Sequence, residues 1–371
     1  MRIAYDHQIF CAQSVGGISR YFSNIAAELS LKGEEVRVFA PLHRNQYLNS
    51  LPKSSVYGLG VRRYIPKTGQ LMLLPNHIVA KRLIKKWKPQ IVHETYYSRK
   101  SCAPLNSCKV LTVYDMIHEK FPQWGSRWDH SALLKRIAVD RADHVICISE
   151  STRKDLLELY NVDPNKASVV HLGAKSRFDS GVERLPESSN ERPYLLYVGA
   201  RLGHKNFSGL LQAYASSARL RADFDLLAFG GGRFTPTEFQ EISRLRLNPN
   251  QVRQVSGSDD FLGQLYARAS AFIYPSTYEG FGLPPLEAMA WGCPVVSSHT
   301  SSMPEVIGDA AEYFDPESAC DMVEAIERVV YSPTRIDELV GEGHQRQAHF
   351  TWERCARKTL DIYNQLVGRY E

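Results

Sequence analysis

The stretch from residue 271 to residue 297, AFIYPSTYEGFGLPPLEAMAWGCPVVS, predicts one complete strand–helix–strand unit. Ala271–Tyr274 and Pro294–Ser297 are short apolar runs of the kind that form buried strands. Between them we expect a helix to begin at Pro284 or Pro285, because proline is tolerated in the first turn of a helix. A strand, a crossover helix and a second strand form the repeating unit of a parallel sheet.

Short apolar runs alternate with helical patterns along nearly the whole chain. Amphipathic stretches such as Ile18–Leu31 and Thr152–Tyr160 separate the runs that we interpret as buried strands. This alternation favours parallel sheets covered by helices on both faces. The further strands that we expect are Arg2–Tyr5, Glu35–Ala40, Gln90–His93, Lys109–Tyr114, His144–Ile148 and Ser168–Leu172 in the first half, and Tyr194–Val198, Phe224–Phe229 and Val252–Ser256 in the second.

One polar segment interrupts the alternation. Residues 174–192 contain Gly, Pro, Ser and Glu without a clear period, which is typical of a linker. We therefore expect an α/β fold of two doubly wound, Rossmann-like domains, residues 1–173 and residues 193–350. A cleft between two such domains, lined by the carboxyl ends of strands, is a natural ligand site.

Length and composition agree with two globular domains. The chain has 371 residues, of which 43% are hydrophobic and 23% charged, the balance of a soluble protein. A net charge of +5 is small for this length, so nucleic acid is not an expected partner. The seven cysteines form no CxxC pair, which argues against a zinc site or a disulfide framework. No signal peptide or membrane-spanning run is evident, so we expect a cytoplasmic location.

The segment from Glu279 to Glu287 carries the strongest candidate site. Glycines at a loop–helix junction let the backbone approach a ligand closely, and free N–H groups at a helix start bind phosphate or sugar oxygens. Glu279 precedes the expected helix and Glu287 lies about one turn inside it, so both could accept hydrogen bonds from sugar or ribose hydroxyls. The alternative is a loop–helix junction with two solvated acids. The candidate donor-binding residues here are Gly280, Phe281, Gly282, Leu283 and Glu287.

A second candidate lies after the first strand of the second domain. In Tyr197–Asn206, YVGARLGHKN, Arg201 and Lys205 form a basic pair at a strand end. Arginine engages phosphate oxygens through two N–H groups and lysine acts as a point charge, so the pair suits a diphosphate. A solvated surface pair is the alternative.

The first domain offers two further candidates. Gly16 and Gly17 precede a predicted helix and allow close approach to an oxyanion, although they do not complete the GxGxxG of dinucleotide sites. Asp115 and His118 follow the fourth strand and are candidates for orienting the acceptor or the sugar. A lone histidine is more often structural.

Neither a metal nor a cofactor is expected. Asp223 and Asp225 form a DxD pattern, but the pattern is common by chance, and two carboxylates alone are a poor cage for a cation.

Residues 79–88, VAKRLIKKWK, predict a basic amphipathic helix. Such a helix can lie on an anionic membrane as a peripheral contact. The segment directly precedes a strand, however, so an ordinary helix packed on the sheet is the alternative.

The string from Glu279 to Val296 closely resembles the EX7E segment of glycosyltransferase family 4, whose members have the two-domain GT-B fold. Other features of that family occur in the expected order, so the resemblance covers nearly the whole chain. It implies that a terminal helix, residues 351–371, crosses back to the first domain. It also implies transfer with retention of anomeric configuration.

The resemblance implies roles for individual residues. Glu287 would bind the nucleotide ribose and Glu279 would lie near the transferred sugar. Arg201 and Lys205 would stabilise the leaving diphosphate, and the Gly16-Gly17 loop would face the donor phosphates or the acceptor. Two positions depart from the family pattern. They are Ala200, which separates Gly199 from the arginine, and Tyr114, which stands where many relatives carry histidine.

The function implied is transfer of a hexose from a nucleotide-diphosphate sugar to a saccharide or lipid-linked saccharide acceptor in bacterial surface-polysaccharide biosynthesis. The YVGARxxxKN and YDMIH strings look most like bacterial mannosyltransferase-type enzymes, which favours mannose and a GDP-mannose donor. The alternatives are a sugar-nucleotide epimerase or phosphorylase on the same fold, or a non-catalytic nucleotide-sugar-binding subunit.

Overall fold

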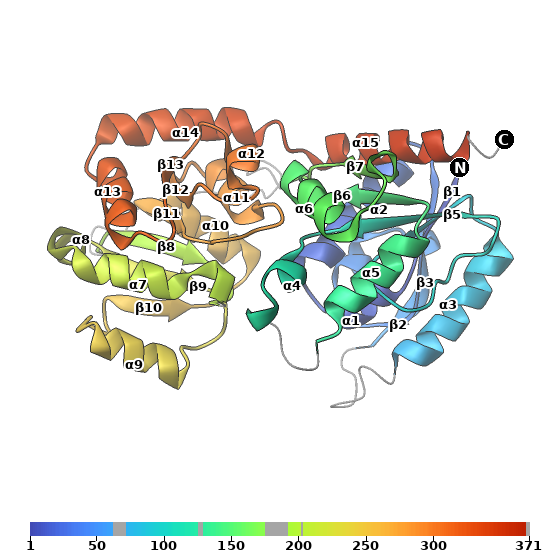
Figure 1. The fold of residues 1–371 in the computed structure, drawn as a ribbon, viewed down its shortest axis with the longest axis horizontal. Helices are drawn as coiled ribbons and strands as arrows, with labels where there is room; N and C mark the ends of the chain where they lie inside the picture. The colour runs from blue at the N-terminus through green and yellow to red at the C-terminus, as the bar shows by residue number, and fades with distance from the viewer. Residues whose placement is uncertain (62–71, 125–128, 175–191, 202, 369–371) are drawn as a thin grey trace. The chain divides into compact units, whose positions relative to one another are not determined.

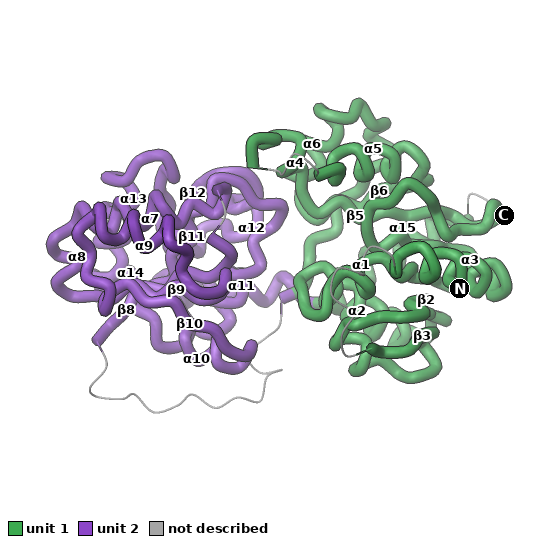
Figure 2. The backbone as a smooth tube through the Cα atoms, turned by 90° about the horizontal axis from the view of Figure 1, so that it is seen from below, with its two compact units in different colours: residues 1–173, 352–371 green, residues 174–351 purple. Residues whose placement is uncertain are grey.

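The computed structural model describes residues 1–61, 72–124, 129–174, 192–201 and 203–368 (Figure 1). The chain divides into two compact units, residues 1–173 with 352–371 and residues 174–351 (Figure 2). Apart from its end residues 174 and 192, the predicted linker lies outside the described residues.

Unit 1 is built on a seven-stranded parallel sheet with the order β3-β2-β1-β4-β5-β6-β7. Its strands are β1 (Arg2–Tyr5), β2 (Glu35–His43), β3 (Val56–Gly60), β4 (Ile91–Glu94), β5 (Cys108–Val113), β6 (His144–Cys147) and β7 (Ala167–Val169). Its helices are α1 (Gln8–Ala12), α2 (Gly17–Leu31), α3 (Leu73–Trp87), α4 (Ile117–Lys120), α5 (Ser131–Arg141), α6 (Glu150–Tyr160) and α15 (Trp352–Val367), with 3-10 turns η1 (Tyr47–Ser50), η2 (Lys53–Ser55), η3 (Pro122–Trp124) and η4 (Pro164–Lys166).

Unit 2 repeats the plan with a six-stranded parallel sheet, order β10-β9-β8-β11-β12-β13. Its strands are β8 (Tyr194–Val198), β9 (Asp225–Phe229), β10 (Val252–Val255), β11 (Ala271–Tyr274), β12 (Val295–Ser298) and β13 (Glu312–Phe314). Its helices are α7 (Phe207–Ser216), α8 (Ala218–Asp223), α9 (Pro236–Arg244), α10 (Asp259–Arg268), α11 (Leu283–Ala290), α12 (Met303–Ile307), α13 (Ala319–Val330) and α14 (Pro333–Gln347), with the 3-10 turn η6 (Gly203–Lys205).

The predicted strands form because they are apolar enough to be buried on both faces. Every residue of β4, β6, β8, β11 and β12 is buried. The sequence analysis missed β3 and β13. All but the first residue of β3 are exposed and two are glycines, while β13 has only three residues, so neither produces a buried apolar run.

Hydroxyl side chains set the start of many helices. Each accepts a hydrogen bond from a backbone N–H in the first turn, which satisfies a donor that has no partner inside the helix. These caps are Ser149 before α6, Ser217 before α8, Thr235 before α9, Ser258 before α10, Ser318 before α13 and Ser332 before α14.

A buried polar chain fastens the terminal helix α15 to the sheet of unit 1. The hydroxyl of Tyr363 lies 2.6 Å from Nδ1 of His93, and the Nε2 atom of His93 lies 2.8 Å from the hydroxyl of Thr112. Tyr5 extends the chain, with its hydroxyl 3.4 Å from that of Tyr363. Burial lowers the pKa of His93 from 6.5 to about 3, so the imidazole is neutral near pH 7.

We expect His93 to make unit 1 sensitive to acid. The pKa of His93 is lower in the folded protein than in the unfolded chain, so protonation favours the unfolded chain. The stability that the neutral imidazole contributes is therefore complete above pH 6.5 and is lost as the pH falls from 6.5 toward 3. In that window His93 should cost roughly 1.4 kcal/mol of unfolding free energy per pH unit. Urea unfolding at pH 5 and pH 7 should show a smaller pH effect in His93→Gln than in wild type. An equal effect in both proteins would show that His93 is not the group responsible.

Candidate active site

The strand order of unit 2 places the predicted residues at one edge of the sheet. The order reverses between the paired strands β8 and β11, because β9 and β10 lie on one side and β12 and β13 on the other. Ligands of open α/β sheets bind beyond the carboxyl ends of strands at such a switch point. The loop 199–206 follows β8, and the loop 275–282 follows β11.

An ion pair joins these two loops. The Nζ atom of Lys205 donates a hydrogen bond to the Oε1 atom of Glu279 at 2.6 Å, although the residues are 74 positions apart. The side chains retain 21% and 10% exposure, so the pair is only partly open to solvent. Burial alone would raise the pKa of Glu279, but the ammonium of Lys205 reverses that effect and the pKa falls below its usual value. Glu279 is therefore a carboxylate at neutral pH.

Helix α11 begins at Leu283, slightly earlier than the predicted start at Pro284 or Pro285. Its cap is Gly282, whose φ of +113° is a conformation that residues with a side chain rarely adopt. Pro284 then occupies the first turn, where its missing N–H costs no helical hydrogen bond. The half-buried Glu287 follows about one turn later.

Hydroxyl groups from the loop after β12 hold the segment that contains Glu279. The hydroxyl of Ser302 lies 2.9 Å from the carbonyl oxygen of Glu279 and 2.8 Å from that of Phe281. Ser301 accepts a hydrogen bond from the Glu279 N–H and donates to its carbonyl. Thr300 donates to the carbonyl of Thr277. The sequence analysis did not identify these residues, and the only signal was the hydroxyl-rich run SSHTSS at 297–302.

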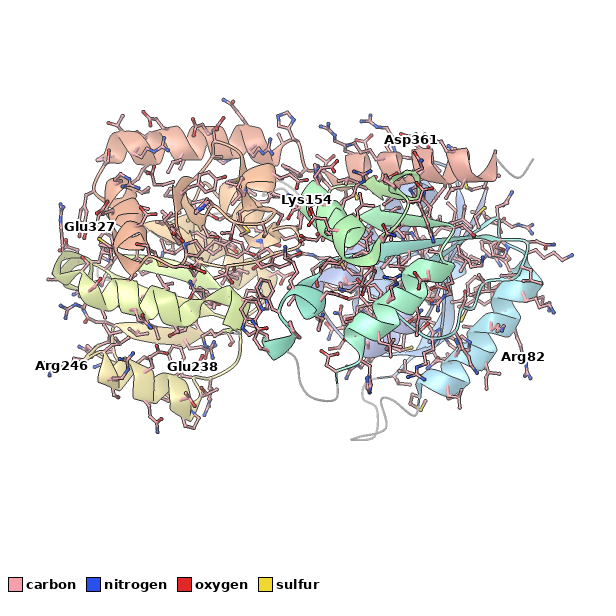
Figure 3. The ribbon with its side chains drawn as sticks, in the orientation of Figure 1. Arg82, Lys154, Glu238, Arg246, Glu327 and Asp361 are labelled. Carbon is pink, nitrogen blue, oxygen red and sulfur yellow. The ribbon has the colours of Figure 1, made fainter. Side chains whose placement is uncertain are left out.

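Arg201 lies on the same loop as Lys205 but contacts a different part of the unit. Its side chain is 3% exposed and forms an ion pair with Glu238. Glu238 lies in the first turn of α9 (Figure 3). Its guanidinium also donates to the carbonyl of Gly230, in the loop after β9. The structure therefore brings Lys205 to Glu279 but does not bring Arg201 there.

In unit 1, Gly16 and Gly17 lie at the start of α2, as predicted. A Cβ atom on Gly16 would lie 2.3 Å from the Oε1 atom of Gln13, whereas one on Gly17 would meet nothing within 4 Å. That Gln13 oxygen accepts the N–H of Ser19 at 3.3 Å. Gly16 therefore makes room for the side chain that caps the helix.

Asp115 and His118 have different interaction partners. Asp115 lies 3.7 Å from the ammonium of Lys135, a lysine that is only 1% exposed. His118 pairs with Asp129 at 3.2 Å through its Nε2 atom. Tyr114 is buried and donates its hydroxyl proton to the carbonyl of Thr95.

Within the described residues, no group of three or more His, Cys, Asp or Glu side chains could hold a metal ion. The two carboxylates of the DxD pattern have separate partners. Asp225 pairs with Arg192 and Arg253, and Asp223 accepts a hydrogen bond from Tyr331.

Two family models match the chain. The model described as Glycosyltransferase Family 4 covers residues 15–176, and that described as Glycosyl transferases group 1 covers residues 183–345.

Among curated proteins, the chain is 31% identical over 241 residues to the O-antigen chain mannosyltransferase B of Escherichia coli, a match of 62% of each chain. It is 29% identical over 291 residues to the O-antigen chain mannosyltransferase RfbU of Salmonella typhimurium, covering 78% of this chain and 75% of the relative. The first match thus spans less than two thirds of that relative's length.

Among solved structures, the sucrose-phosphate synthase of Thermosynechococcus elongatus superposes with a TM-score of 0.74 at 20% identity, over 99% of each chain. Two parallel sheets with covering helices are thus the GT-B fold of two Rossmann-like domains, which confirms the predicted fold class.

Ser302→Ala should destabilise unit 2 by about 1–3 kcal/mol, because the carbonyls of Glu279 and Phe281 lose a buried hydroxyl partner. Ser243→Ala is the matched control, since Ser243 is exposed on α9. Urea unfolding of the two variants measures the difference. Equal losses would show that the Ser302 hydroxyl does not hold the loop.

Proposed function

The chain belongs to the glycosyltransferases that carry a Family 4 domain followed by a group 1 domain, and from that premise we propose that it transfers a hexose from a nucleotide-diphosphate sugar with retention of configuration. The observation that carries the proposal is the Lys205–Glu279 pair at the switch point of unit 2. In such a pair, the ammonium can bind a diphosphate while the neighbouring carboxylate accepts hydrogen bonds from the hydroxyls of the attached sugar.

The reaction is a front-face displacement at the anomeric carbon. The acceptor oxygen forms a bond to that carbon, the bond from the carbon to the diphosphate oxygen breaks, and the leaving oxygen takes the acceptor proton. Lys205 stabilises the negative charge that develops on the diphosphate, together with N–H groups at Gly280–Leu283. One such positioned charge is worth on the order of 100-fold in rate.

The two glutamates have different parts in this proposal. Glu279 is kept ionised by Lys205, so it can accept hydrogen bonds from the sugar. Glu287 binds the ribose hydroxyls from α11.

The remaining candidates lie in unit 1 and act on the donor, the sugar or the acceptor. Gly16 and Gly17 face the donor phosphates or the acceptor. Asp115, which Lys135 supports, and His118, which Asp129 supports, orient the acceptor or the sugar. No metal or other cofactor takes part.

Mannose from GDP-mannose is the proposed sugar and donor. The support is that two relatives are named O-antigen chain mannosyltransferases. The proposed acceptor is correspondingly a saccharide or a lipid-linked saccharide of a bacterial surface polysaccharide.

We also propose that helix α3 makes a peripheral contact with the inner face of the cytoplasmic membrane. Ala80 and Ile84 are buried against the sheet, so one side of α3 belongs to the core of unit 1. The outer side carries exposed apolar and basic side chains, and Figure 3 shows Arg82 on this side. Its exposed residues include Leu74, Ile78, Val79, Lys81, Arg82, Lys85 and Lys86. In the described part of the chain, no helix combines the length and the apolarity needed to cross a bilayer.

The glutamate assignment predicts two separable defects. Glu287→Gln should weaken binding of free GDP about 10-fold or more, because it removes the charge that accepts the ribose hydrogen bonds. Glu279→Gln should leave GDP affinity within about a factor of three but strongly reduce transfer from GDP-mannose. Isothermal titration in EDTA and a transfer assay measure the two effects, with UDP and UDP-glucose run in parallel.

Three results would count against this scheme. Loss of wild-type binding in EDTA with recovery in magnesium would overturn the metal-free model. Equal weakening of GDP by both substitutions would show that the glutamates share one subsite. Donor turnover that leaves an acceptor unmodified would favour a sugar-nucleotide epimerase over a transferase.

The membrane proposal predicts that charge reversal on α3 reduces binding to vesicles of phosphatidylglycerol and phosphatidylcholine. Each lysine near an anionic surface contributes about 1 kcal/mol, so Lys81→Glu/Lys85→Glu should lower binding about 10-fold or more. Lys154→Glu/Arg357→Glu is the control, since these exposed residues lie on α6 and α15. Equal binding by the two double variants in a sedimentation assay would exclude α3 as the contact.

A further inference from the structure

The side chain of Arg201 binds several backbone carbonyls of the loop after β9. Its guanidinium donates hydrogen bonds to Gly230 at 2.7 Å, to Gly232 at 3.0 Å and to Arg233 at 3.1 Å. We call Arg201, Glu238 and the carbonyls of residues 230–233 the carbonyl clamp. The clamp joins the loop after β8 to the loop after β9.

Residues 230–232 have an unusual backbone conformation, and their carbonyls point toward the guanidinium of Arg201. Gly230, Gly231 and Gly232 have φ values of +89°, +68° and +73°, a conformation that side chains disfavour. A Cβ atom on Gly231 would also lie 2.6 Å from the Nη1 atom of Arg201. The backbone conformation therefore favours glycine at all three positions, and the space that the guanidinium occupies favours it further at Gly231.

Glu238 completes the clamp and connects it to α9. Its carboxylate pairs with Arg201 and accepts the backbone N–H of Thr235 at 2.6 Å, while the Thr235 hydroxyl accepts the N–H of Glu238. Burial would raise the pKa of Glu238, but Arg201 and Thr235 lower it, so the carboxylate stays charged. The rings of Phe234 and Phe207 lie 4.9 Å and 5.9 Å from the guanidinium carbon.

Lys205 has a different environment on the same loop. Its partner in the structure is Glu279, and its side chain keeps 21% exposure against 3% for Arg201. The backbone beside it is held by the N–H of Thr277, which donates to the carbonyl of His204 at 2.8 Å. The loop is thus attached to the β9 loop through Arg201 and to the β11 loop beside Lys205.

We propose that Arg201 and Glu238 are positioning residues that hold the loop carrying Lys205, and that Arg201 is not a ligand of the donor diphosphate. The inference rests on the proposed function for the identity of the ligand, but the clamp itself does not depend on it. To reach a phosphate, Arg201 would have to leave at least three carbonyls and would strip Glu238 of its counter-charge. Lys205 needs only to share its ammonium between Glu279 and the incoming anion.

Binding of nucleotides that differ by one phosphate distinguishes a residue that contacts the terminal phosphate from one that only positions the loop. GDP and GMP are the probes, with UDP and UMP in parallel, titrated in EDTA. A residue that contacts the terminal phosphate sets the ratio of the monophosphate Kd to the diphosphate Kd. Lys205→Gln should lower that ratio about 10-fold, whereas Arg201→Lys and Glu238→Gln should keep it within about threefold of wild type even where both affinities fall.

Trypsin cleavage after Arg233 tests the clamp without any ligand, because cutting there requires the 230–233 loop to open. Arg201→Lys and Glu238→Gln should each be cut about 10-fold faster than wild type, and the double variant no faster than the faster single variant, since both remove one interaction. Lys205→Gln should be cut at the wild-type rate. Mass spectrometry identifies the site.

The outcomes are distinct. A ratio that collapses in Arg201→Lys as it does in Lys205→Gln would overturn the positioning role. Unchanged cleavage in both Arg201→Lys and Glu238→Gln would overturn the clamp. If wild type bound none of the four nucleotides, the proposed function would fail, while proteolysis would still decide whether the clamp exists.

Discussion

The ion pair between Lys205 and Glu279 joins the loop after β8 to the loop after β11 in unit 2. The two residues lie 74 positions apart and meet only because β8 and β11 are neighbours at the point where the strand order reverses. A charge pair with this degree of burial persists when its geometry is held and its remaining polar atoms are satisfied. The surrounding structure supplies that constraint, through Ser301 and Ser302 on one loop and the carbonyl clamp on the other.

These supports explain the positions of four glycines of unit 2. Gly282 starts α11 in a conformation that other residues resist, and Gly230–Gly232 turn their carbonyls toward Arg201. Gly282 and Gly230–Gly232 lie in the loops at the carboxyl ends of β11 and β9. Behind these loops, buried apolar residues of α7, α13, β8 and β9 belong to one hydrophobic cluster.

Unit 1 uses buried polar groups in another way. His93 is neutral and joins β4 to the terminal helix α15 through Tyr363, so residues from opposite ends of the chain become one packed body. Lys135 remains fully buried because Glu119 lies 2.8 Å away and the Asp115 carbonyl accepts a further hydrogen bond. A buried charge without such partners would be costly, so this arrangement also fixes the turn that carries Asp115.

The sequence by itself determined the fold class and the order of its elements. Strands such as β8 and β11 were predicted at their observed positions, because burial on both faces demands a continuous apolar run. The segment around Glu279 and Glu287 was also recognisable, since its glycines and prolines indicate a loop followed by the start of a helix. The edge strand β3 and the three-residue β13 left no such pattern.

Only the tertiary structure decided which side chains meet. It paired Lys205 with Glu279, assigned Arg201 to Glu238 and the glycine carbonyls, and brought Ser302 to the loop that it supports. The physical reason is that periodicity and propensity act over neighbouring residues, whereas an ion pair or a hydrogen bond depends on distances of about 3 Å between segments that strand order alone brings together.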